Sequence, residues 1–247
     1  HVLIAEDNEA NQELIKIVLK RYGLSYDLAK NGLEALELFK QKRYDLILMD
    51  EQMPVMDGTE AVRKIIEYEE DKGLRHTPIS ALTANVIKGA KERDLLIGFD
   101  AFLGKPIVLK DLERVFATYL RQDTYVREER LHKAEQKKEK KVYGVDVTQL
   151  KKELMLTQEE LLILLELFIR KMEMTLPELY EAIKLKDYKK IALKAHSIKG
   201  SSGNFRIDEL RKMSTEMEQM AKSNDEVYNY EFTFEKIKRR IADIKIV

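Results

Sequence analysis

The sequence contains no cysteine among its 247 residues. Without a thiol, the chain can form no disulfide, no thiolate metal site and no cysteine nucleophile. It also lacks any apolar run close to the roughly 20 residues that a membrane-spanning helix needs, and no signal peptide is visible. These absences favour a cytoplasmic location for this segment, with any membrane anchor lying elsewhere in a parent protein.

The chain also lacks an excess of charge of either sign, because 44 basic residues balance 44 acidic ones. No overall field therefore attracts nucleic acid or an anionic membrane, and we expect neither as a partner. Hydrophobic residues make up 44% of the chain, which is enough for well-packed cores. The chain starts at His1 without a methionine and already within an apolar run, so we expect it to be a segment of a longer protein.

In the first half, short apolar runs alternate with stretches of helical periodicity. This alternation predicts a doubly wound α/β domain, in which helices cover both faces of a five-stranded parallel sheet. The predicted strands are residues 2–5, 24–28, 45–49, 79–82 and 101–103, and the predicted helices are residues 11–22, 33–40, 59–71, 86–96 and 110–120.

The second half contains no convincing strand. Apolar residues recur there every three or four positions, which predicts a bundle of about four long helices. Pro177 interrupts the first of these patterns, so we expect either a kink or two consecutive helices at that point. We therefore divide the chain into an α/β domain (residues 1–121), a linker (122–142) and an all-α domain (143–247).

The linker is dense in lysine, arginine and glutamate. Such a run is typical of a solvated helix or of a disordered segment, and in either state it separates the two domains. The alternative is a signalling or dimerising helix, but the apolar periodicity is too weak to assign a heptad repeat.

Polar residues follow several strands of the predicted sheet. Glu6 and Asp7 follow the first strand, Asp50 ends the third, and Thr83 and Lys105 follow the fourth and fifth. Each residue alone has an ordinary explanation as a cap or a solvated side chain, but the carboxyl ends of parallel strands form one crevice, where ligands bind. Three carboxylates in that crevice would repel each other without a cation, and oxygen ligands with open water positions suit Mg²⁺.

This constellation resembles the receiver domain of two-component response regulators. The stretches that carry the resemblance are residues 6–8, 49–58, 82–85 and 104–106, which occur in the family's order and spacing and span essentially residues 1–120. The resemblance implies that Asp50 is the phosphoacceptor. It also implies that Glu6, Asp7, Asp50 and the backbone carbonyl of Gln52 hold Mg²⁺.

The same resemblance implies roles for residues on the last two strands. Thr83 and Lys105 would contact the phosphoryl oxygens, and Lys105 would precede Pro106 in a cis peptide bond. Phe102 occupies the place of the aromatic residue that moves with the switch in this family. Plain packing on the strand is the alternative for Phe102.

His196 lies in a predicted helix, where a lone histidine is most often a buried core residue. At 100° per residue, Ile191, Ala195 and Ile198 share one face, and His196 points about 140° away from Ile191. Lys199, Gly200 and Gly203 accompany His196 on that opposite face. We therefore expect His196 to be exposed, with two glycines that let another protein approach and a lysine that attracts phosphoryl oxygens.

Residues 195–205, Ala-His-Ser-Ile-Lys-Gly-Ser-Ser-Gly-Asn-Phe, resemble the active helix of histidine phosphotransfer (HPt) domains, which are four-helix bundles. The resemblance covers about residues 143–247 and implies that His196 is a second phosphoacceptor. Arg206 departs from the pattern, because many members of the family have glycine there.

Together the two resemblances predict a phosphorelay segment, as found at the carboxyl end of a hybrid sensor histidine kinase. Asp50 would accept phosphate from the phosphohistidine of an upstream kinase domain, and His196 would exchange phosphate with this receiver or with a separate downstream one. Nothing in the sequence resembles an ATP-binding kinase domain.

Two alternatives differ in chemistry. In the first, phosphorylation of the receiver regulates a bundle that binds a partner without carrying phosphate. In the second, the first domain is an aspartate-nucleophile phosphatase, but those enzymes usually have a second aspartate where this chain has Gln52.

Overall fold

The computed structural model describes residues 1–83, 97–120 and 142–246. The chain forms two compact units, and the division between them falls within residues 121–141. The predicted helix at residues 86–96 and all of the predicted linker except Val142 lie outside the described residues.

The first unit contains a five-stranded sheet in the order β2-β1-β3-β4-β5, and every pair of neighbouring strands is parallel. This confirms the predicted α/β architecture. All residues of β1, β3 and β4 are buried, as expected for a sheet that is covered on both faces. The strands are β1 (Val2–Ala5), β2 (Tyr26–Ala29), β3 (Leu46–Asp50), β4 (Ile79–Thr83) and β5 (Ala101–Gly104).

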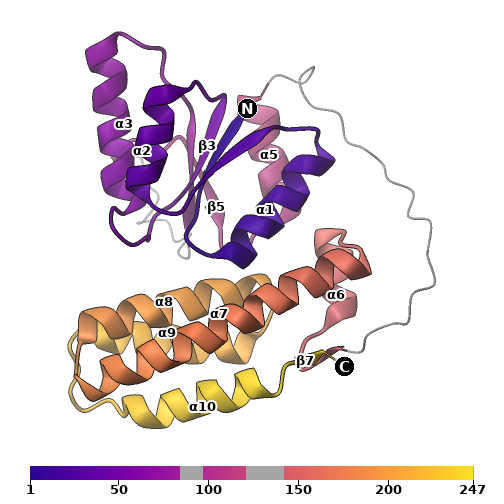
Figure 1. Ribbon diagram of the computed structural model, residues 1–247, viewed down its shortest axis with the longest axis vertical. Helices are drawn as coiled ribbons and strands as arrows, with labels where there is room; N and C mark the ends of the chain where they lie inside the picture. The colour runs from indigo at the N-terminus through magenta and orange to yellow at the C-terminus, as the bar shows by residue number, and fades with distance from the viewer. Residues whose placement is uncertain (84–96, 121–141, 247) are drawn as a thin grey trace. The chain divides into compact units, whose positions relative to one another are not determined.

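Helices cover both faces of this sheet. α1 (Glu9–Arg21) and α5 (Leu109–Tyr119) lie on one face, and α2 (Gly32–Gln41) and α3 (Gly58–Lys72) lie on the other (Figure 1). Polar residues begin three of these helices: the side chains of Asn8, Asn31 and Asp57 accept hydrogen bonds from backbone N–H groups in the first turns of α1, α2 and α3.

The second unit is a bundle of four long helices preceded by a short one. The short helix is α6 (Val147–Leu154), and the long ones are α7 (Gln158–Lys184), α8 (Tyr188–Asn204), α9 (Asp208–Lys222) and α10 (Tyr230–Ala242) (Figure 1). α8 packs against both α7 and α9. The apolar residues of the periodic patterns form the core of this unit. Within it, the ring of Phe168 lies 4.8 Å from that of Phe205.

Two details of the second unit differ from the sequence prediction. A short antiparallel pair joins β6 (Val142–Tyr143) to β7 (Lys245–Ile246), although no strand was expected there. Strands of two residues are too short to produce an alternating pattern. In addition, Val142, which the prediction assigned to the linker, belongs to β6.

The helix that contains Pro177 is a single element of 27 residues. Pro177 lies on the exposed side, where water can satisfy the carbonyl that loses its hydrogen bond. Buried residues before and after it, including Met172 and Leu179, hold both halves against the bundle. Packing therefore keeps the helix continuous.

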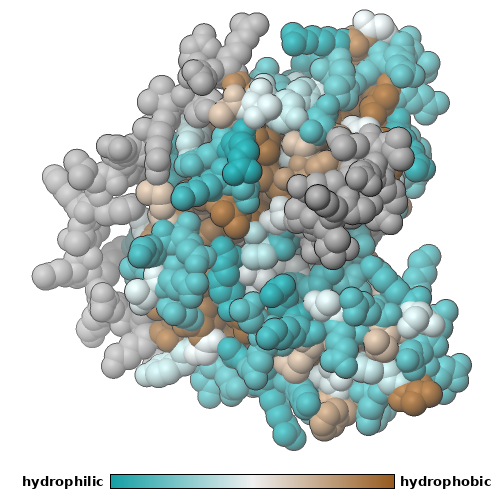
Figure 2. Space-filling model, turned by 180° about the vertical axis from the view of Figure 1, so that it is seen from behind, coloured by the Kyte–Doolittle hydropathy of each residue, from teal (hydrophilic) through white to brown (hydrophobic). Residues whose placement is uncertain are grey.

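The surface agrees with the high content of charged residues. Hydrophilic residues cover most of the face shown in Figure 2, and apolar residues gather only in scattered patches. Among the described residues, no helix is both long enough and apolar enough to cross a membrane.

Candidate functional site

Three carboxylates meet at the carboxyl end of the sheet in the first unit. Glu6 and Asp7 follow β1, and Asp50 is the last residue of β3, the neighbouring strand. One oxygen atom from each lies within 4.8 Å of the others. The strand register produces this cluster, because it pairs Ala5 with Met49 and brings the residues that follow to the same edge.

Lys105 completes the cluster from the loop after β5. Its Nζ atom lies 2.7 Å from Oδ2 of Asp50 and 2.8 Å from Oε2 of Glu6. All three side chains are almost completely buried, with 4% or less of their surface exposed. The Lys105–Pro106 peptide bond is cis, which confirms the prediction.

The environment changes the acidity of Asp50. Burial raises the pKa of Asp50, and the negative charges of Glu6 and Asp7 raise it further, whereas the Lys105 ammonium opposes them. The Lys105 ammonium contacts Asp50 and Glu6, and the three carboxylates of the cluster carry more negative charge than this one ammonium balances. Such a site favours an additional cation.

The oxygen atoms of Glu6 are already engaged by the protein. Oε2 accepts from Lys105, and Oε1 accepts from the backbone N–H of Asn8 and the side-chain amide of Asn11. Glu6 is therefore held rigidly, and Asp7 is the more exposed of the two carboxylates that follow β1.

The remaining predicted residues of the first unit surround Asp50 or lie on the neighbouring strands. The backbone N–H of Gln52 donates to Oδ1 of Asp50 over 3.3 Å. Thr83 is buried at the end of β4 and is paired with Gly104. Phe102 is half-buried on β5, and its ring lies 6.3 Å from that of Phe99. Phe102 therefore packs against the core of the first unit, as its alternative explanation requires.

The loop after β3 passes very close to Asp50. Gly58, the first residue of α3, lies against the backbone of Asp50, and a methyl group at this position would overlap the Asp50 carbonyl oxygen. Glycine at position 58 therefore lets α3 begin directly beside the acidic cluster.

In the second unit, the expectation that His196 is exposed was wrong. The predicted core face of α8 is correct, because Ile191, Ala195 and Ile198 are buried, but His196 is also only 8% exposed. The reason is that α9 packs against α8 and places Glu218 against the His196 ring. A helical wheel gives the direction of a side chain and cannot show which other helix covers it.

His196 takes part in a compact network of charged residues with α9. Its Nδ1 atom lies 3.0 Å from Oε1 of Glu218, a buried carboxylate. Lys199 donates to Oε2 of the same carboxylate over 2.5 Å, and Lys222 donates to Oε1 over 2.6 Å. The prediction placed Lys199 beside the imidazole, and the structure brings the two together through Glu218.

Electrostatics keep Glu218 ionised. Burial raises the pKa of Glu218, but the hydrogen bonds and positive charges of His196, Lys199 and Lys222 outweigh burial and hold the pKa well below its usual range. An ionised carboxylate can only accept hydrogen bonds, so the Nδ1 atom of His196 is the donor in this contact.

The turn after α8 explains the departure at Arg206. This residue has a φ of 56°, a left-handed conformation that glycine adopts more easily than any other residue. The Arg206 side chain offsets that cost, since its guanidinium donates to Glu153 and to the carbonyl oxygens of Gly203 and Asn204.

Sequence reasoning missed Glu218 and Lys222. Charged residues are rarely buried, so Glu218 did not attract attention, and Lys222 has the exposure of an ordinary surface lysine. A signal was nevertheless present, because Glu218 is the neighbour of Met217 in the apolar pattern and lies one helical turn after Ser214, which is also buried.

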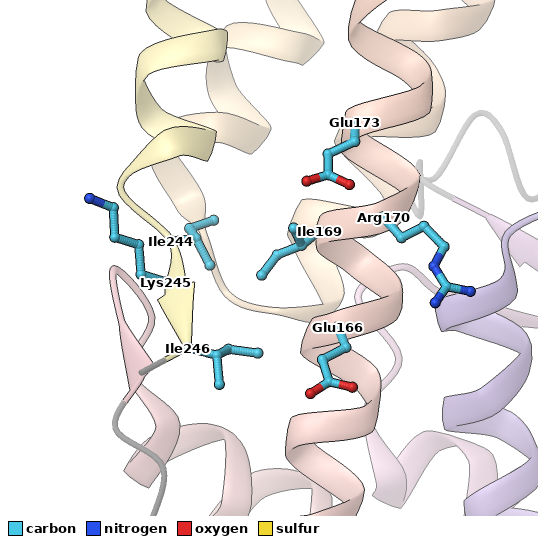
Figure 3. A pocket seen from close by; sticks show the side chains of 7 residues that line it. All are labelled: Glu166, Ile169, Arg170, Glu173, Ile244, Lys245 and Ile246. Atoms are coloured by element: carbon cyan, nitrogen blue, oxygen red, sulfur yellow. The ribbon is translucent and has the colours of Figure 1, made fainter.

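A separate pocket of about 510 Å³ lies between α7 and β7 in the second unit (Figure 3). It contains none of the predicted site residues. Its lining combines isoleucines with charged side chains: Glu166, Ile169, Arg170, Glu173, Ile244, Lys245 and Ile246.

Comparison with known protein families agrees with this division. Residues 2–117 match the family described as the response regulator receiver domain, and residues 163–244 match the Hpt domain. Hybrid signal transduction histidine kinase I of Dictyostelium discoideum is 44% identical over 124 residues, which are 48% of this chain and 7% of the kinase. The chain thus spans only a small part of the hybrid kinases that it matches.

Two further relatives match the receiver region. The polar-differentiation response regulator DivK of Brucella anthropi is 39% identical over 119 residues, which cover 48% of this chain and 94% of DivK. A solved structure of the receiver domain of the Pseudomonas aeruginosa sensor histidine kinase PA1611, with magnesium in its active-site cleft, is 36% identical. It has a TM-score of 0.43 and covers 48% of this chain and 94% of its own. The chain belongs to the response regulator receiver family through its first unit and carries an Hpt domain in its second, the two domain types of two-component phosphorelay signalling.

Proposed function

We propose that Asp50 and His196 are the two phosphoacceptors of a phosphorelay segment. The observation that carries this proposal is that each acceptor lies in a nearly buried network with lysine. Lys105 contacts Asp50 directly, and Lys199 is joined to His196 through Glu218. Lysine supplies the positive charge that a transferring phosphoryl group needs.

At the first site, a carboxylate oxygen of Asp50 attacks the phosphorus of a donor phosphohistidine, and the bond from phosphorus to the donor nitrogen breaks. Lys105 and Thr83 contact the phosphoryl oxygens after transfer. Phe102 follows the movement of Thr83 as the receiver changes state. The buried position of Asp50 shields the acyl phosphate from water.

The acidic cluster fits a magnesium ion, since three carboxylates offer oxygen atoms within 4.8 Å of each other and Lys105 balances only one of their charges. Asp7 and Asp50 would hold the ion with the backbone carbonyl of Gln52, and Glu6 would assist. When bound, Mg²⁺ neutralises charge on the phosphoryl oxygens.

At the second site, His196 exchanges phosphate with this receiver or with a separate one. Gly200 lies one turn after His196 on α8, and both Gly200 and Gly203 are buried. Apart from the backbone of its own helix, a Cβ atom at position 200 would meet no described atom of the chain within 4 Å. Packing within the unit therefore does not require this glycine, and we assign Gly200 and Gly203 to the approach of a receiver.

We further propose that an upstream histidine kinase domain supplies the phosphate and that a downstream receiver takes it. The segment would act in the cytoplasm as part of a hybrid kinase, with a receiver domain at residues 1–121, a linker at 122–142 and an HPt domain at 143–247. It transfers phosphate without using ATP itself.

Two variants of the 247-residue chain test the relay. The His196→Gln chain, labelled at Asp50 with radioactive acetyl phosphate and Mg²⁺, is mixed with the Asp50→Asn chain, which can accept only at His196. We expect label to pass to the second chain as an acid-labile, base-stable phosphohistidine. Label that fails to form on the first chain, or label that persists when both substitutions are combined in one chain, would contradict the proposal.

A further inference from the structure

Asn11 places a polar side chain on the buried, largely apolar side of α1. Leu14, Ile15 and Val18 lie on that side, and each is 3% exposed or less. Asn11 precedes them by about one turn and is only 2% exposed. A buried amide needs hydrogen-bond partners, and asparagine favours a helix interior less than leucine does. The partner of the Asn11 amide therefore shows what this residue contributes.

The Asn11 amide is directed at Glu6, one of the three carboxylates of the first site. Its Nδ2 atom donates to Oε1 of Glu6 over 3.0 Å, and the backbone N–H of Asn8 donates to the same oxygen over 3.2 Å. The neighbouring Gln12, which is 4% exposed, donates from its side chain to the backbone carbonyl of Glu6 over 2.5 Å. The start of α1 thus holds both the carboxylate and the backbone of Glu6.

The second oxygen of Glu6 binds Lys105. Oε2 accepts from the ammonium over 2.8 Å, and the same ammonium contacts Oδ2 of Asp50 over 2.7 Å. A carboxylate can rotate and exchange its two oxygens unless each oxygen has donors of its own. Because α1 occupies Oε1, Oε2 stays directed toward Lys105, and the ammonium has a fixed partner while it lies against Asp50.

We propose that Asn11 is a positioning residue of the first site, which fixes Glu6 and through Glu6 holds the Lys105 ammonium against Asp50. This inference rests on the proposed function of Asp50. It extends the machinery of that site into the first turn of α1.

The fixed contact matters because the two partners of Lys105 change differently during transfer. When an oxygen of Asp50 bonds to phosphorus, the carboxylate becomes an acyl phosphate and loses its negative charge, so its attraction for the ammonium weakens. The bond from phosphorus to the donor nitrogen breaks, and its electron pair stays on that nitrogen. Glu6 keeps its charge throughout, so Lys105 remains tethered while it turns toward the arriving phosphoryl oxygens.

The chemistry of position 11 requires a neutral donor. A leucine has about the same size but offers no hydrogen, so it would remove one of the two donors that hold Oε1 of Glu6. An aspartate would accept where Asn11 donates and would add a further negative charge beside Glu6. Asparagine supplies the hydrogen without adding charge.

Variants of the 247-residue His196→Gln chain separate positioning from structure. Asn11→Leu removes the donor, Glu6→Gln removes the charge of its partner, and a third variant combines both substitutions. Lys20→Leu is the matched control, because it places the same leucine at an exposed position of the same helix.

Two measurements are made on each chain. The first is the rate at which radioactive acetyl phosphate labels Asp50 in the presence of Mg²⁺. The second is made without phosphate donor or metal: the ¹H–¹⁵N signal of the Lys105 ammonium in chains grown with ¹⁵N-lysine, assigned by its loss in Lys105→Arg. A buried ammonium that is firmly bound exchanges its protons slowly with water, so the exchange rate reports how firmly Lys105 is held.

We expect Asn11→Leu to slow labelling by about tenfold and to accelerate proton exchange at Lys105 by about tenfold, because hydrogen bonds to charged groups are among the stronger ones. Glu6→Gln should have a larger effect on both. Since Asn11 acts through Glu6, the combined variant should match Glu6→Gln, without a second tenfold loss. Lys20→Leu should match the parent chain in both measurements.

A further tenfold loss in the combined variant would overturn the inference, because Asn11 would then act independently of Glu6. An unchanged Lys105 signal in Asn11→Leu would overturn it as well, even if labelling slows, since the loss would come from altered packing. If Asn11→Leu does not fold, Asn11→Asp decides by the same two measurements, and unchanged values there would also overturn it. If the parent chain takes no label at Asp50, the proposed function fails, whereas the Lys105 signals still decide whether Asn11 fixes the ammonium.

Discussion

The two proposed acceptor sites use the same kinds of side chain in opposite arrangements. In the first unit, the buried lysine contacts the acceptor itself, since Lys105 binds Asp50 and the neighbouring Glu6. In the second unit, Glu218 binds both the acceptor and the lysines. In the proposed function, a carboxylate is therefore the nucleophile at one site and the partner of the nucleophile at the other.

The balance of charge differs accordingly. The first site places three carboxylates around one ammonium, whereas the second places two ammonium groups and an imidazole around one carboxylate. A phosphoryl group brings more negative charge to either site. From this comparison we expect the aspartate site to depend on an added cation and the histidine site to use the ammonium groups already beside it.

Removal of Mg²⁺ is the strongest test of this difference. We expect chelation with EDTA to reduce the labelling of Asp50 by acetyl phosphate by at least about 100-fold, because the excess negative charge would then face the phosphoryl group uncompensated. Labelling of His196 by phosphoramidate, a small donor that phosphorylates imidazole directly, should not change.

The Asp50→Asn and His196→Gln chains serve as controls, since each carries one acceptor. Equal sensitivity of both labels to EDTA would break the comparison. The measurement follows two labels over time: the base-labile label at Asp50 on the His196→Gln chain and the acid-labile label at His196 on the Asp50→Asn chain.

Glycine substitutions give the next largest expected effect. Gly58→Ala should lower the free energy of unfolding of the first unit by about 3 kcal/mol, because the added methyl group meets the backbone of Asp50, which cannot move aside easily. Gly200→Ala, in contrast, should leave the second unit unchanged or stabilise it by up to about 1 kcal/mol, because alanine favours a helix.

Urea unfolding of the two variants measures both effects. Gly200→Ala should in addition slow label transfer between chains if an incoming receiver approaches at that position. Strong destabilisation of the bundle by Gly200→Ala would show that the glycine serves packing within the unit.

The smallest expected effect concerns a second histidine–carboxylate contact, at His76 in the first unit. Nδ1 of His76 lies 2.7 Å from Glu69, and Nε2 lies 3.0 Å from Asp100. Only the doubly protonated ring can donate to both. Burial lowers the pKa of His76, but the hydrogen bonds and charges of the two carboxylates outweigh burial and raise it overall.

A raised pKa in the folded state gives a stabilisation that is complete below the unfolded value of about 6.5 and is lost as the pH rises through the folded value. Because 45% of the His76 side chain is exposed, solvent screens the contact, and we expect less than about 1 kcal/mol. Urea unfolding between about pH 5.5 and pH 8.5 should show this loss in the parent chain but not in His76→Gln. Parallel pH profiles for the two chains would contradict the assignment.

The comparison also extends to reactivity. Both ring nitrogens of His76 face carboxylates, whereas Glu218 takes Nδ1 of His196. While both contacts are made, the doubly protonated His76 ring has no lone pair that could attack phosphorus, so we do not propose His76 as an acceptor.

Much of the first site could be predicted because its residues are tied to strand ends. Asp50 and Lys105 each follow an apolar run directly, and a parallel sheet must bring the carboxyl ends of such runs to one edge. The contact between Lys105 and Glu6 could not be predicted, since it joins residues 99 positions apart through the packing of separate strands.

The second site was less predictable because its parts come from two helices. The sequence identifies His196 and the core face of its helix, but a helical period carries no information about the neighbour that covers the opposite face. Glu218 lies 22 residues away, on α9, and only the packing of α8 against α9 brings the two side chains into contact.

By itself, the sequence determined the two kinds of domain, the five strands and four long helices, and it singled out Asp50 and His196 as the acceptors that we propose. These features depend on local patterns of apolar residues and on short motifs. The tertiary structure alone decided that His196 is largely buried, that Glu218 holds both His196 and two lysines, and that one ammonium faces three carboxylates at Asp50. The physical reason is that charge balance and burial depend on which residues distant in sequence become neighbours when helices and strands pack.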